Sequence, residues 1–462
     1  MSRGRGIDGL SGTDKDKLLA GVRATRKAAK GRRPTELAAV RDAKRRTAFD
    51  FGELQPVRQM RMQRAAADLL GIENPYFRSH AGIAGNRTTI GNREYINFSS
   101  YDYLGLNGHP AVIDAAKSAI DQYGVSVSAS RLVAGERPIH RDLERSIAEF
   151  LGVEDCVVMV SGHATNVTTI GHLLGPKDLV LYDALIHNSI TEGARLSGAT
   201  RRMFPHNDLD ALEDMLTQMR DRAERVLIVV EGLYSMDGDM PDLPRLLSIK
   251  RRFDAWLMVD EAHSLGVLGA TGRGLAEHWD VDPNEVEIWM GTLSKTLCGC
   301  GGYIAGSTTL IEYLKLSAPG FLYSVGMPGA VAAAAKVCLD LLEREPERVA
   351  RIRENGHRFV ARARERGLDI GPSAGYCVVP VIVGESVSAA LLSQRLHDGG
   401  VNALPIIFPA VAERSARIRF FVTAAHTDEE IDTTVDLTAE ALAEVRAAGS
   451  QLKKLVGDRV RS

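Results

Sequence analysis

From about residue 95 the chain alternates between short apolar runs and longer amphipathic stretches. In the stretch IHRDLERSIAEFLG, Leu143, Ile147 and Phe150 fall on one helical face. The apolar runs are continuous and short, which is typical of strands buried on both faces of a sheet. They are CVVMV (156–160), LVLYD (179–183), RVLIVVEG (225–232), AWLMVDE (255–261), EIWMGT (287–292) and GGYIAGS (301–307). Repeated strand–helix–strand units predict an α/β fold with a large, mostly parallel sheet covered by helices on both sides.

A different pattern follows the helical stretch at about 329–366. It consists of a strand at 377–384, a helix near 386–398, a strand at 416–423 and a final helix near 427–448. This order predicts a smaller α+β domain. We therefore expect a basic N-terminal extension at 1–75, a large domain at 76–330, and a connecting helix with the small C-terminal domain at 331–462. The segment before about 95 is expected to join the small domain or a partner subunit.

The composition is that of a globular protein and excludes a collagen, a disordered chain and a small disulfide-rich protein. The chain has 462 residues, 25% charged and 45% hydrophobic, which is ordinary for a globular protein. The formal net charge is −2, so the molecule as a whole gives no electrostatic case for binding nucleic acid. Residues 1–50, however, hold 14 lysines and arginines against 6 acidic residues. A basic first segment therefore precedes a mildly acidic remainder.

The cysteines and the apolar runs indicate the compartment. Five scattered cysteines are too few to stabilise so long a chain by disulfide bonds. Cys298 and Cys300 have no second pair of cysteines with which to form a zinc site. The longest apolar runs fall short of the roughly 20 residues of a membrane span, and the first residues lack the apolar core of a signal peptide. We expect a cytoplasmic protein with no metal site and no membrane span.

Polar residues follow five of the predicted strands in succession. Because the carboxyl ends of parallel strands meet at one edge of a sheet, these residues are expected to gather around a ligand there. Any one of them alone could cap a helix or sit in a solvated loop, but five successive strand ends are hard to explain in that way. The residues are Ser161, Gly162 and His163, then His187, then Glu231 and Ser235, then Asp260 and His263, and finally Thr292, Ser294 and Lys295.

This set of groups matches the needs of pyridoxal phosphate. The cofactor requires a lysine that binds its aldehyde and a carboxylate that keeps its ring nitrogen protonated. Lys295 and Asp260 are the candidates, and His263 is placed to reach the phenolic oxygen of the ring. Its phosphate requires backbone N–H groups at a helix start together with hydroxyl groups. Those groups are expected from Ser161, Gly162, His163, Thr292 and Ser294.

Seven ordered motifs resemble the α-oxoamine synthases, which include serine palmitoyltransferase and the 7-keto-8-aminopelargonate, 5-aminolevulinate and 2-amino-3-ketobutyrate enzymes. The resemblance covers about 75 to 445. It implies a fold-type-I pyridoxal-phosphate transferase, a homodimer, and decarboxylative condensation of an amino acid with an acyl thioester to give an α-amino ketone. The motifs are NFSSYDYLGL (97–106), SASRLVAGERPIHRDLE (128–144), SGHATN (161–166), EGLYSMDGDMPDL (231–243), MVDEAHSLGVLG (258–269), GTLSKTLCGCGGYIAG (291–306) and ARIRFFVTAAH (416–426).

The resemblance implies roles for further residues. His187 matches the imidazole stacked on the cofactor ring, and Ser235 lies beside that ring. Arg419 matches the arginine that holds the substrate carboxylate, although a salt bridge at the sheet edge is its alternative. Tyr101 stands where several members have Asn beside the substrate carboxylate, although serine palmitoyltransferases often have Tyr there. Ser324 is the one hydroxyl in YSVGMP, where a Thr-Ser pair is common, and is the candidate for phosphate contact across the dimer interface.

Two rival functions remain. An aminotransferase or racemase of the same fold would share Lys295 and Asp260 but not the motifs SMDGD and SRLVAGERPIH. A regulator with a pyridoxal-phosphate-binding domain would suit the basic start, yet residues 1–75 show no helix-turn-helix or winged-helix pattern. We therefore favour a cytoplasmic acyltransferase.

The acyl donor is expected to be acyl-coenzyme A or an acyl-carrier protein. Two motifs look most like synthases of polyketide-type pathways, in which carrier-bound acyl groups are common donors. A basic arm could steer an acidic carrier protein, and coenzyme A is also polyanionic, while a solvated tail is the alternative for such a charge run. The basic residues of this arm are Arg23, Arg26, Lys27, Lys30, Arg32, Arg33, Lys44, Arg45 and Arg46.

Overall fold

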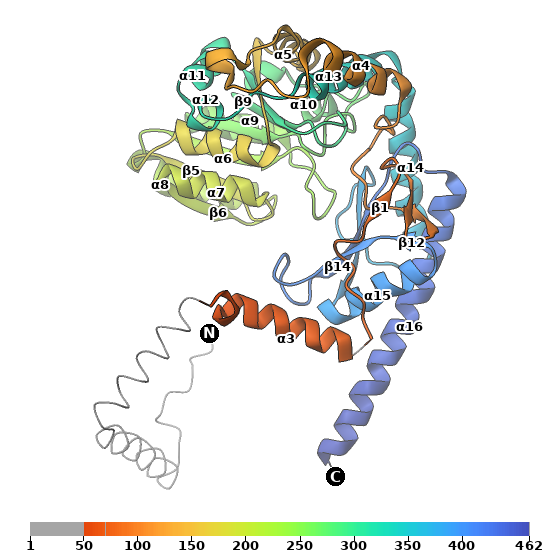
Figure 1. Cartoon of the computed structure of the whole chain (residues 1–462). Helices are drawn as coiled ribbons and strands as arrows, with labels where there is room; N and C mark the ends of the chain where they lie inside the picture. Colours follow the sequence, from red (N-terminus) through yellow and green to blue (C-terminus); the bar gives the residue numbers. More distant parts are fainter. Residues whose placement is uncertain (1–49, 70, 462) are drawn as a thin grey trace, which may run out of the picture. The chain divides into compact units, whose positions relative to one another are not determined.

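The computed structural model describes residues 50–69 and 71–461, and the chain divides after Glu73 into two compact units (Figure 1). In the first unit, the Asp50 carboxylate accepts a hydrogen bond of 2.8 Å from the Gly52 backbone and so caps a short 3-10 helix. The described elements of this unit are η2 (Phe51–Glu53) and α3 (Gln55–Leu69). The expectations about the basic arm at residues 1–49 lie outside the described residues.

The second unit is built around a seven-stranded sheet of order β4-β10-β9-β8-β7-β5-β6. Strands β6, β5, β7, β8 and β9 run parallel to one another, while β10 is antiparallel to both β4 and β9. The strands are β4 (Asp155–Met159), β5 (Leu179–Asp183), β6 (Thr200–Phe204), β7 (Val226–Glu231), β8 (Trp256–Asp260), β9 (Ile288–Thr292) and β10 (Gly302–Gly306). The predicted α/β fold with a large, mostly parallel sheet is confirmed.

The apolar runs form strands because both faces of this sheet are covered. Along β7, Ile228 and Val230 pack into one hydrophobic core, while Leu227 and Val229 pack into a second core on the opposite face. The helices that cover the sheet or connect its strands are α4 (Pro110–Tyr123), η3 (Arg131–Gly135), α5 (Pro138–Leu151), α6 (Gly162–Leu173), α7 (Asn188–Ser197), α8 (Leu209–Met219), η4 (Arg220–Arg222), α9 (Leu243–Arg252), α10 (Leu275–Trp279), η5 (Pro283–Glu285), α11 (Thr308–Ser317) and α12 (Pro319–Leu322). Figure 1 shows several of them around the sheet.

Two smaller sheets complete the second unit. One has the order β1-β2-β3-β12 and the other β11-β14-β13. Their strands are β1 (His80–Ala81), β2 (Arg87–Ile90), β3 (Arg93–Asn97), β11 (Val378–Gly384), β12 (Val401–Asn402), β13 (Leu404–Ile406) and β14 (Ala416–Phe421). The parallel pairing of β3 with β12 ties the segment before residue 97 to the C-terminal part of the chain. The expected domain boundaries stay a prediction.

Four further helices follow. α13 (Gly329–Arg344) packs against α4 and α5, whereas α14 (Glu347–Glu365), α15 (Ser386–Asp398) and α16 (Asp428–Arg461) accompany the small sheets. The stretch at 329–366 forms two helices rather than one, because Pro346 lies between them and has no N–H to continue a helix. Within the part of the chain that the structure describes, no helix combines the length and the apolar character needed to cross a membrane.

Candidate active site

A cavity of about 440 Å³ lies where β7, β8 and β9 end and β14 approaches them. It brings together all of the expected site residues except one. Those lining it are Tyr101, Ser161, Gly162, His163, His187, Ser235, Asp260, His263, Thr292, Ser294, Lys295 and Arg419. The topology explains the convergence, since the carboxyl ends of parallel strands share one edge of the sheet.

The exception is Ser324. Its hydroxyl donates a hydrogen bond of 2.6 Å to the Gly320 carbonyl. It lines a separate small pocket beside Arg131 rather than the main cavity. The expected contact with phosphate across a subunit interface therefore stays a prediction.

Lys295 and Asp260 place an amine and a carboxyl group in the same cavity. Asp260 ends β8 and is 4% exposed, and its carboxylate accepts hydrogen bonds from Asn166 Nδ2 (2.9 Å) and from the backbone N–H of Ala262 (3.0 Å). Lys295 follows β9, and burial lowers the pKa of its amine although the charges of Asp260 and Glu231 act the other way. Its Nζ lies 5.9 Å from the centroid of the Tyr101 ring.

A chain of hydrogen bonds connects Asp260 with His187. Asn166 Nδ2 also donates to Ser189 Oγ at 3.0 Å, and the Ser189 hydroxyl lies 2.7 Å from Nδ1 of His187. Because the Asn166 amide donates to Ser189, we infer that the serine hydrogen points to His187 and that the histidine proton is on Nε2. Burial lowers the pKa of His187, which favours this neutral ring.

His263 is fixed in a similar way from the other side. The hydroxyl of the fully buried Tyr103 lies 2.6 Å from His263 Nδ1. Burial raises the pKa of Tyr103 and lowers the pKa of His263, so the tyrosine is the donor and the imidazole is neutral. The remaining hydrogen on His263 then belongs to Nε2.

The start of α6 forms a corner suited to an anion. Ser161 caps this twelve-residue helix by accepting a hydrogen bond from Ala164 N at 3.3 Å. Gly162 is required there, because a Cβ on it would lie 2.8 Å from Thr292 Oγ1. The Thr292 hydroxyl lies 2.8 Å from that of Ser294. Free N–H groups at a helix start together with hydroxyls are the donors that bind phosphate.

Arg419 reaches the cavity from β14. One of its Nη atoms donates to the Ser235 carbonyl at 2.9 Å, and its guanidinium stacks 4.6 Å from the centroid of the Phe421 ring. Its Nε is buried and has no hydrogen-bond partner among the described residues. A buried guanidinium with an unused donor fits a bound carboxylate. The salt bridge of this strand belongs instead to Arg417, which pairs with Asp237.

Among the further residues that line the cavity, Asn166 and Glu231 were given no role from the sequence. Asn166 was overlooked because it stands in the second turn of α6, where an asparagine has no sequence signal of its own. Glu231 was noted at a strand end but given no role. Both carry a buried oxygen without a hydrogen-bond partner, Asn166 Oδ1 and Glu231 Oε1.

The residues present fit pyridoxal phosphate. Gly162 at the anion-binding corner lines the cavity, and so do Asp260, Lys295 and Arg419. The unpartnered atoms of Arg419, Asn166 and Glu231 mark hydrogen-bonding capacity that this chain alone leaves unused. Among the described residues, no cluster of three or more His, Cys, Asp or Glu side chains could hold a metal ion.

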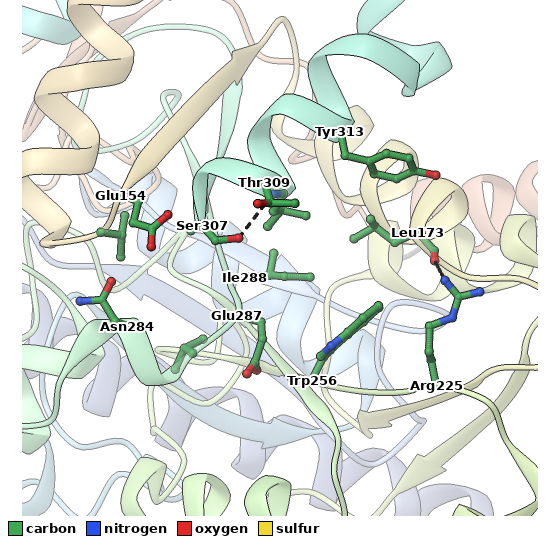
Figure 2. A pocket seen from close by; sticks show the side chains of 14 residues that line it. Glu154, Leu173, Arg225, Trp256, Asn284, Glu287, Ile288, Ser307, Thr309 and Tyr313 are labelled. Atoms are coloured by element: carbon green, nitrogen blue, oxygen red, sulfur yellow. Dashed lines mark hydrogen bonds between the residues drawn. The ribbon is translucent and has the colours of Figure 1, made fainter.

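A second cavity of about 430 Å³ lies at the opposite end of the same strands (Figure 2). Trp256 and Ile288 begin the strands that Asp260 and Thr292 end. Its charged side chains have protein partners, for Arg225 pairs with Asp178 and Glu287 with Lys250. The chemically equipped cavity is therefore the one at the carboxyl ends.

Comparison with known proteins identifies the family of this chain. Residues 93–437 match the family model of class I and II aminotransferases. The 8-amino-7-oxononanoate synthase of Methylococcus capsulatus is 41% identical over 356 residues, which cover 77% of this chain and 91% of that protein. The serine palmitoyltransferase structure from Sphingomonas wittichii superposes with a TM-score of 0.82 at 27% identity, covering 86% of this chain and 99% of that chain.

A longer relative also matches. The 4-hydroxy-2,2'-bipyrrole-5-methanol synthase PigH of a Serratia strain is 36% identical over 353 residues, covering 76% of this chain. The aligned part is 54% of PigH, so this chain spans about half the length of that relative. The chain belongs to the class I and II aminotransferase family and, within it, to the α-oxoamine synthases, the pyridoxal-phosphate-dependent acyltransferases that condense an amino acid with an acyl thioester and release carbon dioxide.

Proposed function

We propose that this cavity holds an amino acid by its carboxylate at Arg419 and presents its α-carbon to Lys295. The observation that carries the proposal is the meeting of three groups in one cavity: the Lys295 amine, the Asp260 carboxylate and the unused Nε of Arg419. The acyl thioester then supplies the carbonyl that the α-carbon attacks. The product of such a condensation is an α-amino ketone.

Each part of the cofactor has a candidate partner. Lys295 would bind its aldehyde, Asp260 its ring nitrogen, and His187 and His263 its ring face and phenolic oxygen. Ser161, Gly162, His163, Thr292 and Ser294 would hold its phosphate. When bound, pyridoxal phosphate supplies an electron sink that makes the α-carbon acidic.

Lys295 is suited to move the α-proton. A general base must be unprotonated at the working pH, and burial lowers the pKa of this amine toward that range. The Asp260 side chain accepts hydrogen bonds from two N–H groups, those of Asn166 and Ala262, which fix its direction.

The two neutral histidines donate hydrogen bonds rather than carry charge. With Nδ1 engaged by Ser189 or Tyr103, each imidazole offers Nε2–H to a ligand. Tyr101, whose ring lies edge-on to Phe421 at 4.8 Å and faces Lys295, would limit the space beside the substrate. We expect Tyr101 to influence which amino acid is accepted.

The decisive experiment compares products. With both substrates, a synthase releases thiol and carbon dioxide in equal amounts. An aminotransferase instead converts the cofactor to its pyridoxamine form with an amino acid alone, and a racemase releases neither thiol nor carbon dioxide. Accumulation of the pyridoxamine form in proportion to enzyme would overturn the proposal.

The substrates themselves are the next question. The relative from Methylococcus capsulatus is named for a product with adjacent amino and oxo groups, which is the pattern we propose here. PigH is named for a bipyrrole, a different end product. Mass spectrometry of the ketones formed from a panel of amino acids and thioesters would identify the pair that this chain uses.

We further propose that the enzyme works as a homodimer. The segments around η3 and α12 expose large apolar side chains, with Val133 80% and Tyr323 87% exposed. A hydrogen bond of 2.9 Å from Gly326 N to Ala129 O joins these segments, and Ser324 lies among them. Sedimentation should give a dimer mass that Tyr323→Asp lowers, whereas a monomeric parent protein would contradict the proposal.

The place of the enzyme is proposed as the cytoplasm, because all five cysteines of the described structure are free, as expected in a reducing compartment. Cell fractionation tests this assignment. The acyl donor is proposed to be carried by coenzyme A or by an acyl-carrier protein that the basic arm attracts.

A further inference from the structure

We propose that Glu231 is a proton-bearing hydrogen-bond donor of this pocket, whose Oε1–H points to an acceptor of the bound cofactor or substrate. The residue ends β7, is 3% exposed and lines the cavity. Its Oε2 accepts a hydrogen bond of 3.0 Å from Ser235 N. Its Oε1 is buried without a partner. The inference rests on the proposed function only in taking the cavity as the cofactor site.

The register of the sheet places the Glu231 carboxyl group beside that of Asp260. Glu231 and Asp260 are direct partners on the neighbouring parallel strands β7 and β8. Two buried carboxyl groups so placed do not both ionise readily, and the better solvated one keeps the charge. Asp260 has donors in Asn166 and Ala262, whereas Glu231 has the Ser235 N–H. The proton therefore resides on Glu231.

Electrostatics from every side agree with this assignment. Burial, together with the charge of Asp260, raises the pKa of Glu231 to about 8, while the Ser235 N–H, the Lys295 charge and the backbone N–H of His187 oppose the shift. The other ionisable group that faces it is Arg419 on β14. The charge of Lys295 lowers the pKa of Glu231 only a little. Burial lowers the pKa of the Lys295 amine itself, and that amine is the proposed attachment point of the cofactor.

A purely structural role is the alternative. In that case Glu231 would serve only to hold the turn after β7 through Ser235 N. An oxygen acceptor of any kind would suffice for that turn, and Oε1 would remain idle when the pocket is filled. Leaving a buried donor without an acceptor is unfavourable, so the unpaired Oε1 indicates that the pocket's ligand completes it.

Infrared difference spectroscopy tests the proton directly. The spectrum of the wild type minus that of Glu231→Gln should contain the carbonyl stretch of a protonated carboxylic acid at pH 7. That band should shift when pyridoxal phosphate is added, because Oε1–H gains an acceptor. A band that appears only below pH 5, or one that does not move on loading, would overturn the proposal.

Glu261 provides the matched control. It is the next residue after Asp260, fully buried, and burial raises the pKa of its carboxyl to about 7. Its Oε1 accepts from Leu275 N at 2.9 Å, and its other oxygen is enclosed by Gly232 and Gly274, away from the cavity. The carboxyl band removed by Glu261→Gln should not respond to cofactor.

Cofactor affinity gives the second readout. The amide of Glu231→Gln keeps both an acceptor for Ser235 and a donor for the ligand, whereas Glu231→Leu keeps neither. We expect Glu231→Leu to weaken binding of pyridoxal phosphate to the apoprotein by about tenfold relative to Glu231→Gln. Equal affinities would mean a structural role only. Neither readout needs turnover, so a failed thiol and carbon dioxide assay would refute the proposed function while leaving this inference to stand or fall by itself.

Discussion

The side-chain amide of Asn166 donates a hydrogen bond of 2.9 Å to Oδ2 of Asp260, from a position one helical turn inside α6. The same nitrogen donates to Ser189 Oγ, which contacts His187 Nδ1. One buried amide thus sets the direction of both the carboxylate and the imidazole. Such supporting contacts hold reactive groups in place and are costly to lose.

Replacing Asn166 by leucine should therefore impair catalysis without unfolding the protein. Asp260 loses one of its two donors and His187 loses the fixed direction of its ring. We expect turnover to fall by about 10- to 100-fold. The absorbance spectrum of the bound cofactor should change as well, because its protonation depends on Asp260. Steady-state kinetics and a pH series of spectra measure these effects.

Thr169→Val is the matched control for this variant. Thr169 lies on the same helix, is fully buried, and its hydroxyl has no hydrogen-bond partner. It does not line the cavity. Loss of turnover equal to that of Asn166→Leu would show that any polar change in α6 is damaging, and would remove Asn166 from the site.

Much of the fold was predictable because β4, β5, β7, β8, β9 and β10 are buried on both faces and so read as continuous apolar runs. Strand β6 was missed for the opposite reason. It is an edge strand in which Thr200 to Met203 are exposed, so TRRMF has no apolar pattern. Tertiary pairing with β5 alone makes it a strand.

The site divides along a similar line. The placement of Asp260 and Lys295 in the cavity could be predicted because each follows an apolar strand and carries a group that the proposed chemistry requires. Asn166 and Glu231 could not be given roles, since their importance comes from side-chain contacts and from the register of β7 against β8. Ser324 shows the converse, because a residue type that suits phosphate binding does not reach the cavity of its own chain.

Lys295 should be the residue that borohydride labels. Reduction of the holoenzyme fixes the pyridoxyl group to the amine that binds it, and Lys295 is the lysine that lines the described cavity. Peptide mass spectrometry should find the label at this residue. Lys336, which pairs with Asp340 on α13, serves as an internal control and should stay unlabelled. A label on any other lysine would refute the assignment.

Arg419→Lys should raise the KM for the amino acid by about tenfold or more, with a smaller effect on kcat. A lysine ammonium is a point charge and cannot reproduce the planar two-donor grip of a guanidinium on a carboxylate. Arg417→Lys is the control, because that residue lies two positions away on β14 and pairs with Asp237. An unchanged KM in Arg419→Lys would place this residue outside the substrate site.

His206 should make stability depend on pH. It lies between Asp183 and Asp239, at 2.8 and 2.9 Å, and its side chain is 21% exposed. Burial alone would lower its pKa, but the hydrogen bonds to both carboxylates outweigh burial and raise it to about 10. A raised folded-state pKa means that the stabilisation is complete below about pH 6.5 and disappears as the pH rises toward 10.

The corresponding variant is His206→Gln. We expect it to lower the free energy of unfolding by about 1–3 kcal/mol at pH 6, less than for a fully buried ion pair because the ring is partly exposed. The difference from the wild type should shrink steadily between pH 6.5 and 10 in denaturant titrations. His172→Gln, which removes a contact with the neutral Ser317 hydroxyl, should show no such trend. A difference independent of pH would contradict a charged His206.

The basic arm offers the last prediction. Residues 1–50 carry 14 basic and 6 acidic residues, and long-range attraction to an acidic carrier protein raises the rate of encounter at low salt. Deleting residues 1–50 should lower kcat/KM for a carrier-bound acyl group by about tenfold at low ionic strength, and the loss should vanish near 1 M salt, where charges are screened within about 3 Å.

Comparing coenzyme A with the carrier protein as donor distinguishes recognition of the carrier from attraction of any negatively charged molecule. The same acyl group on coenzyme A presents phosphates on a small, fast-diffusing molecule, so it gains less from a protein-sized basic surface. A larger loss for the carrier than for coenzyme A indicates recognition of the carrier, and equal losses indicate attraction of any polyanion. Changing Arg32, Arg33, Arg45 and Arg46 to glutamine in the full chain should reproduce most of the deletion's effect. If the deletion leaves kcat/KM for both donors unchanged at low salt, the arm plays no part in docking, because its proposed effect comes only from the attraction of its charge.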